Sequence, residues 1–142
     1  MIYQPVTLNE ADDLAVAALS RATELHCSPL TIAVLDLGGH VVVLKRQDGS
    51  GILRPDIAIG KAWGALGMGM SSRVLAERAK SKAQFFTSLA AVSGGRLVLA
   101  PGGVLIYRGG CIVGAVGVSG DSSDRDEECA LAGIESVGLD AE

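Results

Sequence analysis

Apolar residues recur every three to four positions in the first part of the chain. They are Leu8, Ala11, Leu14, Ala15, Ala18, Leu19, Ala22 and Leu25. This spacing places them on one face of an α-helix. Thr7 and Glu10 have the spacing of a capping box, in which hydroxyl and carboxylate bind the first free backbone amides. The helix is expected to end near Cys27, because Ser28-Pro29 follows.

Two pairs of apolar, β-branched runs follow, each pair separated by two glycines. The first pair is Thr31–Leu37 and His40–Arg46, and the second is Val104–Arg108 and Cys111–Ser119. Two glycines supply the positive φ angles of a tight hairpin turn, so each pair predicts a β-hairpin. Cys111–Ser119 is apolar on both alternating faces, which predicts a central strand covered by helices on each side. Arg96–Ala100 is expected to form a further strand.

Four further helical segments are expected. Asp56 is placed to cap a second helix running to about Met70, and Ser71 or Ser72 to cap a third. A broken helical stretch covers 84–92, and 122–124 caps a closing helix. Hairpins together with helices predict an α+β fold: one antiparallel sheet with helices on both faces, forming a single domain over residues 1–142.

The amino-acid composition and the net charge argue against several classes of function. The net charge is −4 with scattered basic residues, which argues against a nucleic-acid partner. Three cysteines without metal-ligand spacing argue against a disulfide framework, and two histidines without a third ligand argue against a zinc site. The first ten residues lack the basic and apolar regions of a signal peptide, and no run has membrane-spanning length. A cytoplasmic protein without a membrane partner is expected.

Glycine is abundant, with 19 residues, and three glycines lie within the expected second helix. Gly60, Gly64 and Gly67 have i, i+4, i+7 spacing and share one helix face. Each costs roughly 0.5–1 kcal/mol relative to alanine in a helix interior. Something therefore approaches this backbone closely: either another helix, of the same chain or of a second copy, or a flat or bulky ligand. Trp63 beside this face is either a core residue or a stacking surface.

Polar residues near these glycines are candidates for ligand binding. Lys61 is either an anion clamp or base in an apolar groove, or a lysine whose ammonium reaches solvent. Arg46 and Asp48 form either a turn-stabilising ion pair or a pair that orients a polar ligand. Gly102-Gly103 either presents backbone amides to an anion or makes a sharp bend. The candidate ligand-binding set is Arg46, Asp48, Lys61, Gly64, Ser71, Gly102 and Gly103.

Several of these motifs, in the same order, resemble the GlcG/HbpS family, also called domain of unknown function 336. The matching segments are AVLDLGGHVVVLKRQDG (33–49), IGKA (59–62), SSRVL (71–75), GGRLVLAPGGVLIYRGGCIVGAVGVSG (94–120) and DEECA (126–130). The resemblance covers nearly the whole chain. It implies a profilin-like, five-stranded antiparallel sheet flanked by helices, and homo-oligomers with an even number of subunits. It also links the chain to the C-terminal domain of PduO-type corrinoid adenosyltransferases, and to haem or a corrinoid as ligand.

Three functional hypotheses follow. The first is an oligomeric small-molecule-binding protein of the GlcG/HbpS type, with haem or a corrinoid as the ligand class implied by the resemblance. The second is a cofactor-independent isomerase, tautomerase or lyase for a small carboxylated metabolite, with Lys61 and Asp48 in its pocket. The third is an interaction domain whose glycine face packs a dimer.

Overall fold

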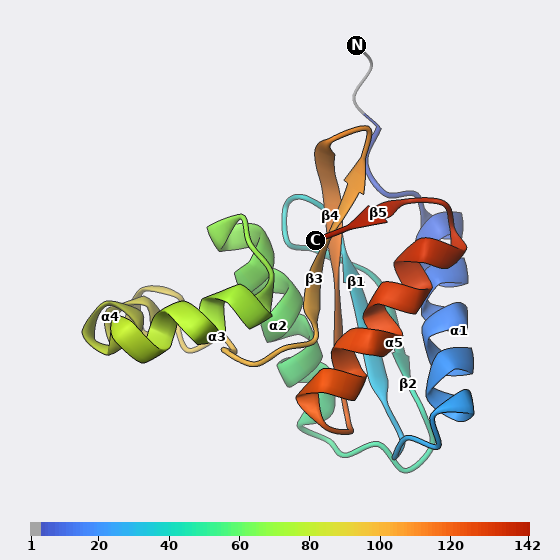
Figure 1. Ribbon diagram of the computed structural model, residues 1–142, viewed down its shortest axis with the longest axis horizontal. Coiled ribbons are helices and arrows are strands. Elements are labelled where there is room, and N and C mark those ends of the chain that lie inside the picture. Colours follow the sequence, from blue (N-terminus) through green and yellow to red (C-terminus); the bar gives the residue numbers. More distant parts are fainter. Residues whose placement is uncertain (1–3) are drawn as a thin grey trace.

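The computed structural model describes residues 4–142, and its centre is a five-stranded antiparallel sheet with helices on both faces (Figure 1). The strands are β1 (Thr31–Leu35), β2 (Val41–Arg46), β3 (Gly103–Arg108), β4 (Cys111–Ser119) and β5 (Asp140–Ala141). Their order is β2-β1-β4-β3-β5, so the apolar strand β4 is central, as its sequence predicts. The predicted α+β fold is confirmed.

Both glycine pairs lie in the predicted hairpin turns, but the first turn is longer than predicted: β1 ends at Leu35, β2 begins at Val41, and Gly39 alone of its pair has a left-handed φ. Gly39 has φ 80°, and its amide donates to the Asp36 carbonyl at 3.0 Å. Gly109 and Gly110 have φ 57° and 82°, which are left-handed values that a two-residue hairpin turn needs at both central positions. The hairpins β1–β2 and β3–β4 then join through the pairing of β1 with β4, from Thr31–Ser119 to Leu35–Ala115.

Helices α1 (Leu8–Glu24) and α5 (Ser123–Ser136) cover one face of the sheet (Figure 1). The capping box of α1 is formed: the Thr7 hydroxyl accepts from the Glu10 amide at 3.1 Å, and the Glu10 carboxylate accepts from the Thr7 amide at 2.9 Å. Alanines on α1 let it pack closely, and Gly133 of α5 lies against the Leu14 carbonyl. The larger hydrophobic core lies between these helices and the sheet.

Helix α2 (Arg54–Met68) covers the opposite face. Its predicted start at Asp56 is wrong: the helix begins two residues earlier, because Pro55 in the first turn needs no amide partner there. The sheet carries glycines where α2 crosses it. A Cβ atom on Gly117 would collide with the Ala58 carbonyl, and a Cβ atom on Gly103 with the Lys61 carbonyl. These glycines bring α2 into direct contact with the sheet backbone.

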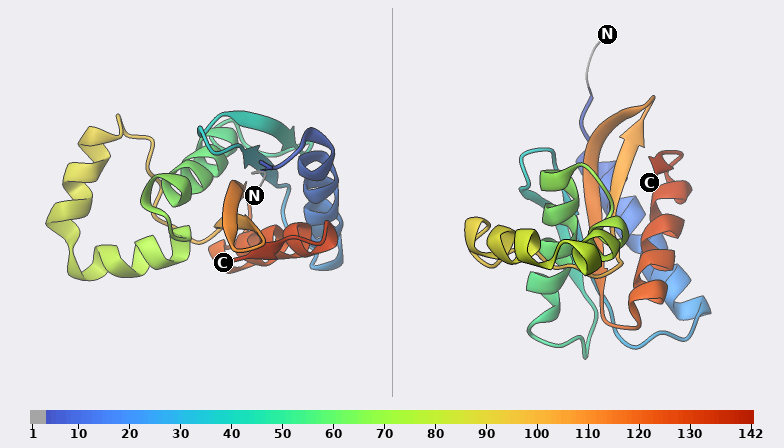
Figure 2. Two further views of the ribbon diagram at one scale, coloured as in Figure 1. Left: turned by 90° about the horizontal axis from the view of Figure 1, so that it is seen from above. Right: turned by 60° about the vertical axis from the view of Figure 1, so that its left-hand side comes forward.

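Helices α3 (Ser72–Ser81) and α4 (Ala83–Val92) form an arm that projects from the body (Figures 1 and 2). Ser71 caps α3 as predicted, its hydroxyl accepting from the Val74 amide at 3.4 Å. Helix α4 is continuous rather than broken, and it packs mainly on α3. Several of its apolar side chains are exposed, including Phe85 at 52% and Val92 at 83%.

The predicted strand at Arg96–Ala100 is wrong. This segment is extended, but it lies along α2 instead of pairing with the sheet, because Gly60 and Gly64 leave room for it there. The fifth strand is the short β5, which pairs with Ile106 and Tyr107 of β3 and carries no strong sequence signal. No helix among residues 4–142 is long and apolar enough to span a membrane.

Candidate functional site

Lys61 and Asp126 form a buried ion pair that connects the two helical layers. Lys61 lies on α2 and Asp126 on α5, at opposite faces of the sheet, yet Nζ and Oδ2 are 3.2 Å apart. The two side chains are only 3% and 2% exposed. The Lys61 ammonium also donates to the Val118 carbonyl at 2.9 Å, and Asp126 Oδ1 accepts from the Asp121 amide at 3.0 Å.

Gly102 and Gly103 make this contact possible. Strand β5 pairs only with the far half of β3, so Gly103 lies at the sheet edge. A Cβ atom on Gly102 would lie 2.9 Å from the Lys61 ammonium, and one on Gly103 would collide with the Lys61 carbonyl. Ser72 completes the arrangement, because its hydroxyl accepts from the Gly103 amide at 2.7 Å. The lysine side chain therefore passes across the sheet edge over two glycines.

Burial dominates the electrostatics of the pair. It raises the pKa of Asp126 and lowers the pKa of Lys61, because each charge is removed from water. The mutual attraction and the amide donors at Asp126 act in the opposite direction. Because desolvation offsets much of the mutual attraction, we expect the pair to fix the relative positions of the two layers more than to add stability.

The structure thus places Lys61 against Gly102 and Gly103. Ser72 accepts a hydrogen bond from Gly103, and Ser71 is its neighbour in the chain. We call these residues, with Asp126, the buried polar cluster. Neither Lys61 nor Asp126 lines the polar hollow at Arg46 or the two apolar hollows beside α2. Every buried side-chain nitrogen and oxygen among residues 4–142 has a hydrogen-bond partner. Both charged groups of the cluster are buried and hydrogen-bonded, so the cluster has the geometry of a structural element.

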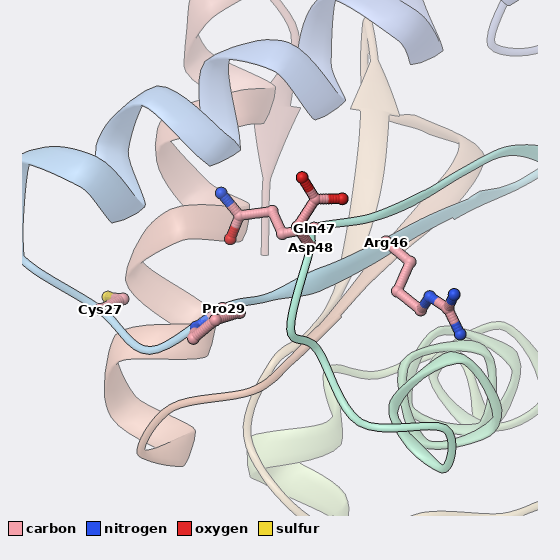
Figure 3. A pocket seen from close by; sticks show the side chains of 5 residues that line it. All are labelled: Cys27, Pro29, Arg46, Gln47 and Asp48. Atoms are coloured by element: carbon pink, nitrogen blue, oxygen red, sulfur yellow. The ribbon is translucent and has the colours of Figure 1, made fainter.

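Arg46 and Asp48 lie elsewhere, around an open polar hollow of about 470 Å³ (Figure 3). Cys27, Pro29 and Gln47 complete its lining. The Arg46 and Asp48 side chains point in different directions, and no ion pair joins them among residues 4–142. Neither Arg46 nor Asp48 shares a hollow with Lys61, so the structure does not bring the polar groups of the enzyme hypothesis together.

The glycine face of α2 is covered by protein over two of its three positions. A Cβ atom on Gly60 would lie 2.5 Å from the Arg96 carbonyl, and one on Gly64 would lie 2.6 Å from Leu97 Cδ1. Gly67 has no neighbour within 4 Å of such an atom. The covering element is the extended segment 96–98, and neither of the expected alternatives, a helix or a ligand, lies directly on Gly60 and Gly64.

Two apolar hollows lie beside this segment. The larger, of about 460 Å³, is lined by Leu53, Asp56, Ile57, Ile59, Gly60, Gly95, Arg96 and Val98. The smaller, of about 160 Å³, is lined by Trp63, Gly64, Gly67, Met68, Leu89, Val92, Ser93 and Leu97. Arg96 of the larger hollow stacks on Trp63 of the smaller, with its guanidinium carbon 3.9 Å from the ring centroid. We call the two hollows with this pair the α2 groove.

The guanidinium of Arg96 is oriented but not neutralised. Its Nε donates to the Ser93 carbonyl at 2.9 Å, and the Trp63 ring supports its face. Within residues 4–142, no carboxylate pairs with it. A fixed cation beside mostly apolar walls, with Asp56 as the one carboxylate in the lining, suits a ligand that combines a flat apolar body with an acidic group.

The histidines lie outside this groove. His40 is 81% exposed, with Nδ1 3.4 Å from Asp36 Oδ1, and His26 follows α1 with φ 55°. Within the described part of the chain, no group of three histidine, cysteine or carboxylate side chains is arranged to hold a metal ion. The residues that sequence reasoning missed are Arg96 and Asp126. Their only signals were a basic residue after Gly94-Gly95 and an acidic residue in a helix first turn.

Related proteins match nearly the whole chain in sequence. An uncharacterized 15.0 kDa protein encoded in the dhaT-dhaS intergenic region of Citrobacter freundii is 27% identical over 130 residues, covering 92% of this chain and 90% of that protein. The corrinoid adenosyltransferase PduO of Salmonella typhimurium is 28% identical over 137 residues. That match covers 95% of this chain but only 40% of PduO, so the chain spans less than half of that enzyme.

Two solved structures have the same fold as this chain. The PduOC:heme complex has a TM-score of 0.88 and 25% identity, covering 96% of this chain and 98% of that one. HbpS has a TM-score of 0.81 and 27% identity, covering 96% and 92%. The family model for the "Haem degrading protein HbpS-like" group matches residues 6–135. This match spans most of the chain, which therefore belongs to the HbpS-like family.

Proposed function

We propose that this protein binds haem in the α2 groove. The observation that carries the proposal is the Arg96–Trp63 pair, a fixed cation and a flat aromatic ring between two apolar hollows. A relative with the same fold over 96% of this chain, the PduOC domain, has been crystallised as a haem complex. PduO also contributes the link to a corrinoid, which is an alternative ligand of the same tetrapyrrole class.

The fit of haem to the groove rests on its ring and its carboxylates. Apolar side chains such as Ile57, Ile59 and Leu97 would contact the ring, and Arg96 would pair with a propionate. Neither hollow is lined by a histidine, and Met68 is the only sulfur-containing residue in their linings. Haem, when bound, supplies the redox chemistry of its iron. The protein's part is to hold the ring and to set its access to water.

Hemin titration tests the proposal. We expect a saturable shift of the Soret band and quenching of the fluorescence of Trp63, the only tryptophan in the chain. Arg96→Met is expected to weaken binding at least tenfold, because it removes the one cation of the groove. Arg46→Met is the matched control: it removes an arginine from the polar hollow and should leave the affinity unchanged.

Metal-free protoporphyrin IX and a cobalamin separate the ligand hypotheses. Since the groove offers no histidine, protoporphyrin IX should bind within about threefold of hemin. Tighter binding of the cobalamin than of either porphyrin would identify a corrinoid as the ligand. If no tetrapyrrole binds saturably at micromolar concentration, or if Arg96→Met binds hemin as well as the unmodified protein, the proposal is wrong.

We further propose that the protein is a homo-oligomer with an even number of subunits. The support is the apolar surface left uncovered on one copy: Ile52 is 91% exposed, Leu53 62%, and Phe85 and Val92 lie on the projecting arm. Large exposed apolar patches mark contact surfaces. Light scattering should return an even multiple of the 14.5 kDa chain mass at micromolar concentration. A mass near 14.5 kDa would contradict this proposal.

The enzyme hypothesis has less support from the geometry. It needs Lys61 and Asp48 in one pocket, but Lys61 is buried and bonded to Asp126 and Val118, whereas Asp48 lines the polar hollow. The enzyme hypothesis would regain support if the protein turned over a small carboxylated metabolite and if Asp48→Asn abolished that turnover.

A further inference from the structure

Helix α4 lies at the outer end of the arm and leaves most of its apolar surface uncovered (Figures 1 and 2). Residues 83–95 include no charged side chain. Phe86 is the only buried residue of α4, whereas Phe85 and Val92 are largely exposed. A helix without a charged face is normally buried in a folded protein. The composition of α4 therefore indicates a helix that another molecule covers.

Contacts at the root of α3 hold the arm in a fixed orientation. The Ser72 hydroxyl accepts from the Gly103 amide at 2.7 Å, which ties α3 to β3. Arg73 Nε donates to the Glu127 carboxylate at 3.0 Å, and another nitrogen of the same guanidinium donates to Asp124, so α3 is also tied to α5. A projecting element that is already held in place loses little conformational freedom when it binds. The arm is therefore suited to a stable protein contact.

A surface suited to receive this arm lies on the same chain, beside the first turns of α2. Leu53 lines the larger hollow of the α2 groove, and both Leu53 and its neighbour Ile52 are largely exposed. The arm projects from the side of the body on which α2 lies, so one molecule carries both a projecting element and an apolar recess (Figure 1). Two such molecules related by a two-fold axis each receive the arm of the other.

Two charged side chains are placed to orient this contact. Lys82 lies at the elbow between α3 and α4, and Asp56 lines the larger hollow. Within residues 4–142, neither of these side chains takes part in an ion pair or a hydrogen bond. Opposite charges at the edge of an apolar contact select the partner and its orientation. The cation on the arm and the carboxylate at the recess are therefore complementary.

We propose that two copies of this chain associate with α4 of each copy against the first turns of α2 of the other. Lys82 of one copy pairs with Asp56 of the second copy, and Phe85 contacts Ile52 and Leu53 of the second copy. This inference rests on the proposed homo-oligomer and assigns its contact surface. The arm of the second copy forms the outer wall of the larger hollow, which one chain alone leaves open. Each dimer therefore contains two complete α2 grooves.

Charge reversal tests the assigned pair in the protein without haem. Lys82→Glu and Asp56→Lys should each weaken association about tenfold, measured by light scattering over a dilution series, because each change places like charges together. The double variant Lys82→Glu/Asp56→Lys should restore association. Lys80→Glu is the matched control: Lys80 lies on α3 and pairs with Glu77 of its own chain, so this change should leave association unchanged. A double variant that associates no better than the single variants would overturn the assigned pair.

Phe85→Asp tests the apolar part of the contact. It should lower the mass to 14.5 kDa while far-UV circular dichroism is unchanged, because Phe85 is exposed and an acidic residue is favourable in a first helical turn. If Phe85→Asp keeps an even multiple of the chain mass, the arm is not the contact surface, although the homo-oligomer stands. If the unmodified protein itself has a mass of 14.5 kDa, both proposals are wrong.

Hemin binding tests whether the groove is shared between the copies. Monomeric Phe85→Asp should bind hemin about fivefold more weakly than the unmodified protein, because the outer wall of the larger hollow is lost. Equal affinities would overturn the shared groove. Failure of the unmodified protein to bind hemin would contradict the proposed ligand and leave the masses of the variants as the test of the contact surface.

Discussion

Replacing Lys61 by methionine leaves the Asp126 carboxylate buried without its cation. Methionine keeps most of the stem that packs over Gly102, so the change removes mainly the charge and the donors to Asp126 and Val118. Removal of one member of a buried ion pair costs about 3–5 kcal/mol. The side chains are 3% and 2% exposed, so solvent cannot compensate. Against a total stability of about 5–15 kcal/mol, the variant should fold but melt at least about 10 °C lower.

The penalty should depend on pH in a defined direction. Burial raises the pKa of Asp126 above its unfolded value, and losing Lys61 raises it further. A group of this kind favours the folded state while it is protonated and loses that contribution as the pH increases through the folded pKa. The stability difference between the unmodified protein and Lys61→Met should therefore be large at pH 7 and smaller near pH 4.

Urea denaturation at both pH values measures this difference. Lys61→Met/Asp126→Leu removes both charges and should recover most of the loss, because apolar replacement of a whole buried pair is close to neutral. Lys45→Met is the surface control, since Lys45 and Asp12 are 33% and 50% exposed and their pair contributes at most about 1 kcal/mol. If Lys61→Met costs no more than Lys45→Met, or if its penalty is the same at both pH values, the pair does not fix the two layers.

Two other tests address separate parts of the fold. Gly67→Ala should stabilise the protein by about 0.5–1 kcal/mol in urea denaturation, because a Cβ atom there meets nothing within 4 Å. Gly60→Ala should destabilise the protein, because its Cβ atom would contact the Arg96 carbonyl. Equal effects of the two variants would show that segment 96–98 does not pack on α2. Arg108, together with the hydrogen bonds of Thr7, lowers the pKa of Glu10 from its ordinary value of 4.5 to about 2, so Arg108→Met should raise that pKa, measured by NMR, towards 4.5. In the unmodified protein Glu10 stabilises the fold above about pH 4.5 and loses this contribution as the pH decreases towards 2; an unshifted Glu10 would contradict the assigned pairing.

The elements that sequence reasoning predicted well are those with local causes. The helix face of α1, its capping box and the glycine turns at 38–39 and 109–110 depend on neighbours within a few positions. The prediction of a strand at Arg96–Ala100 was wrong for the opposite reason. Its apolar residues fit a strand, but its partner is the glycine face of α2, about 35 positions away, and close packing there outweighs strand pairing.

The candidate site was predicted only in part, for the same reason. The sequence indicated that Lys61, Gly102 and Gly103 are special, because a lysine in an apolar helix turn and a glycine pair before a strand are locally costly. It did not show that they meet Asp126, because that contact crosses the sheet edge between segments far apart in the chain. It also did not show that Arg96 lies on Trp63.

The pairing of β1 with β4 has a consequence for folding order. Each hairpin turn is short, with fewer than ten residues between its strands. The sheet is complete only when Thr31 pairs with Ser119 and Leu35 with Ala115, which are far apart in the chain. Loop closure over such distances makes non-local strand pairing slow compared with hairpin formation. During synthesis, the edge of β1 that carries Ile32 and Val34 stays without its partner until the ribosome has completed β4 at Ser119. The nascent protein therefore presents an unpaired, apolar edge at β1 for most of its synthesis, and charged substitutions in the neighbouring loop 47–53 offer a way to protect it.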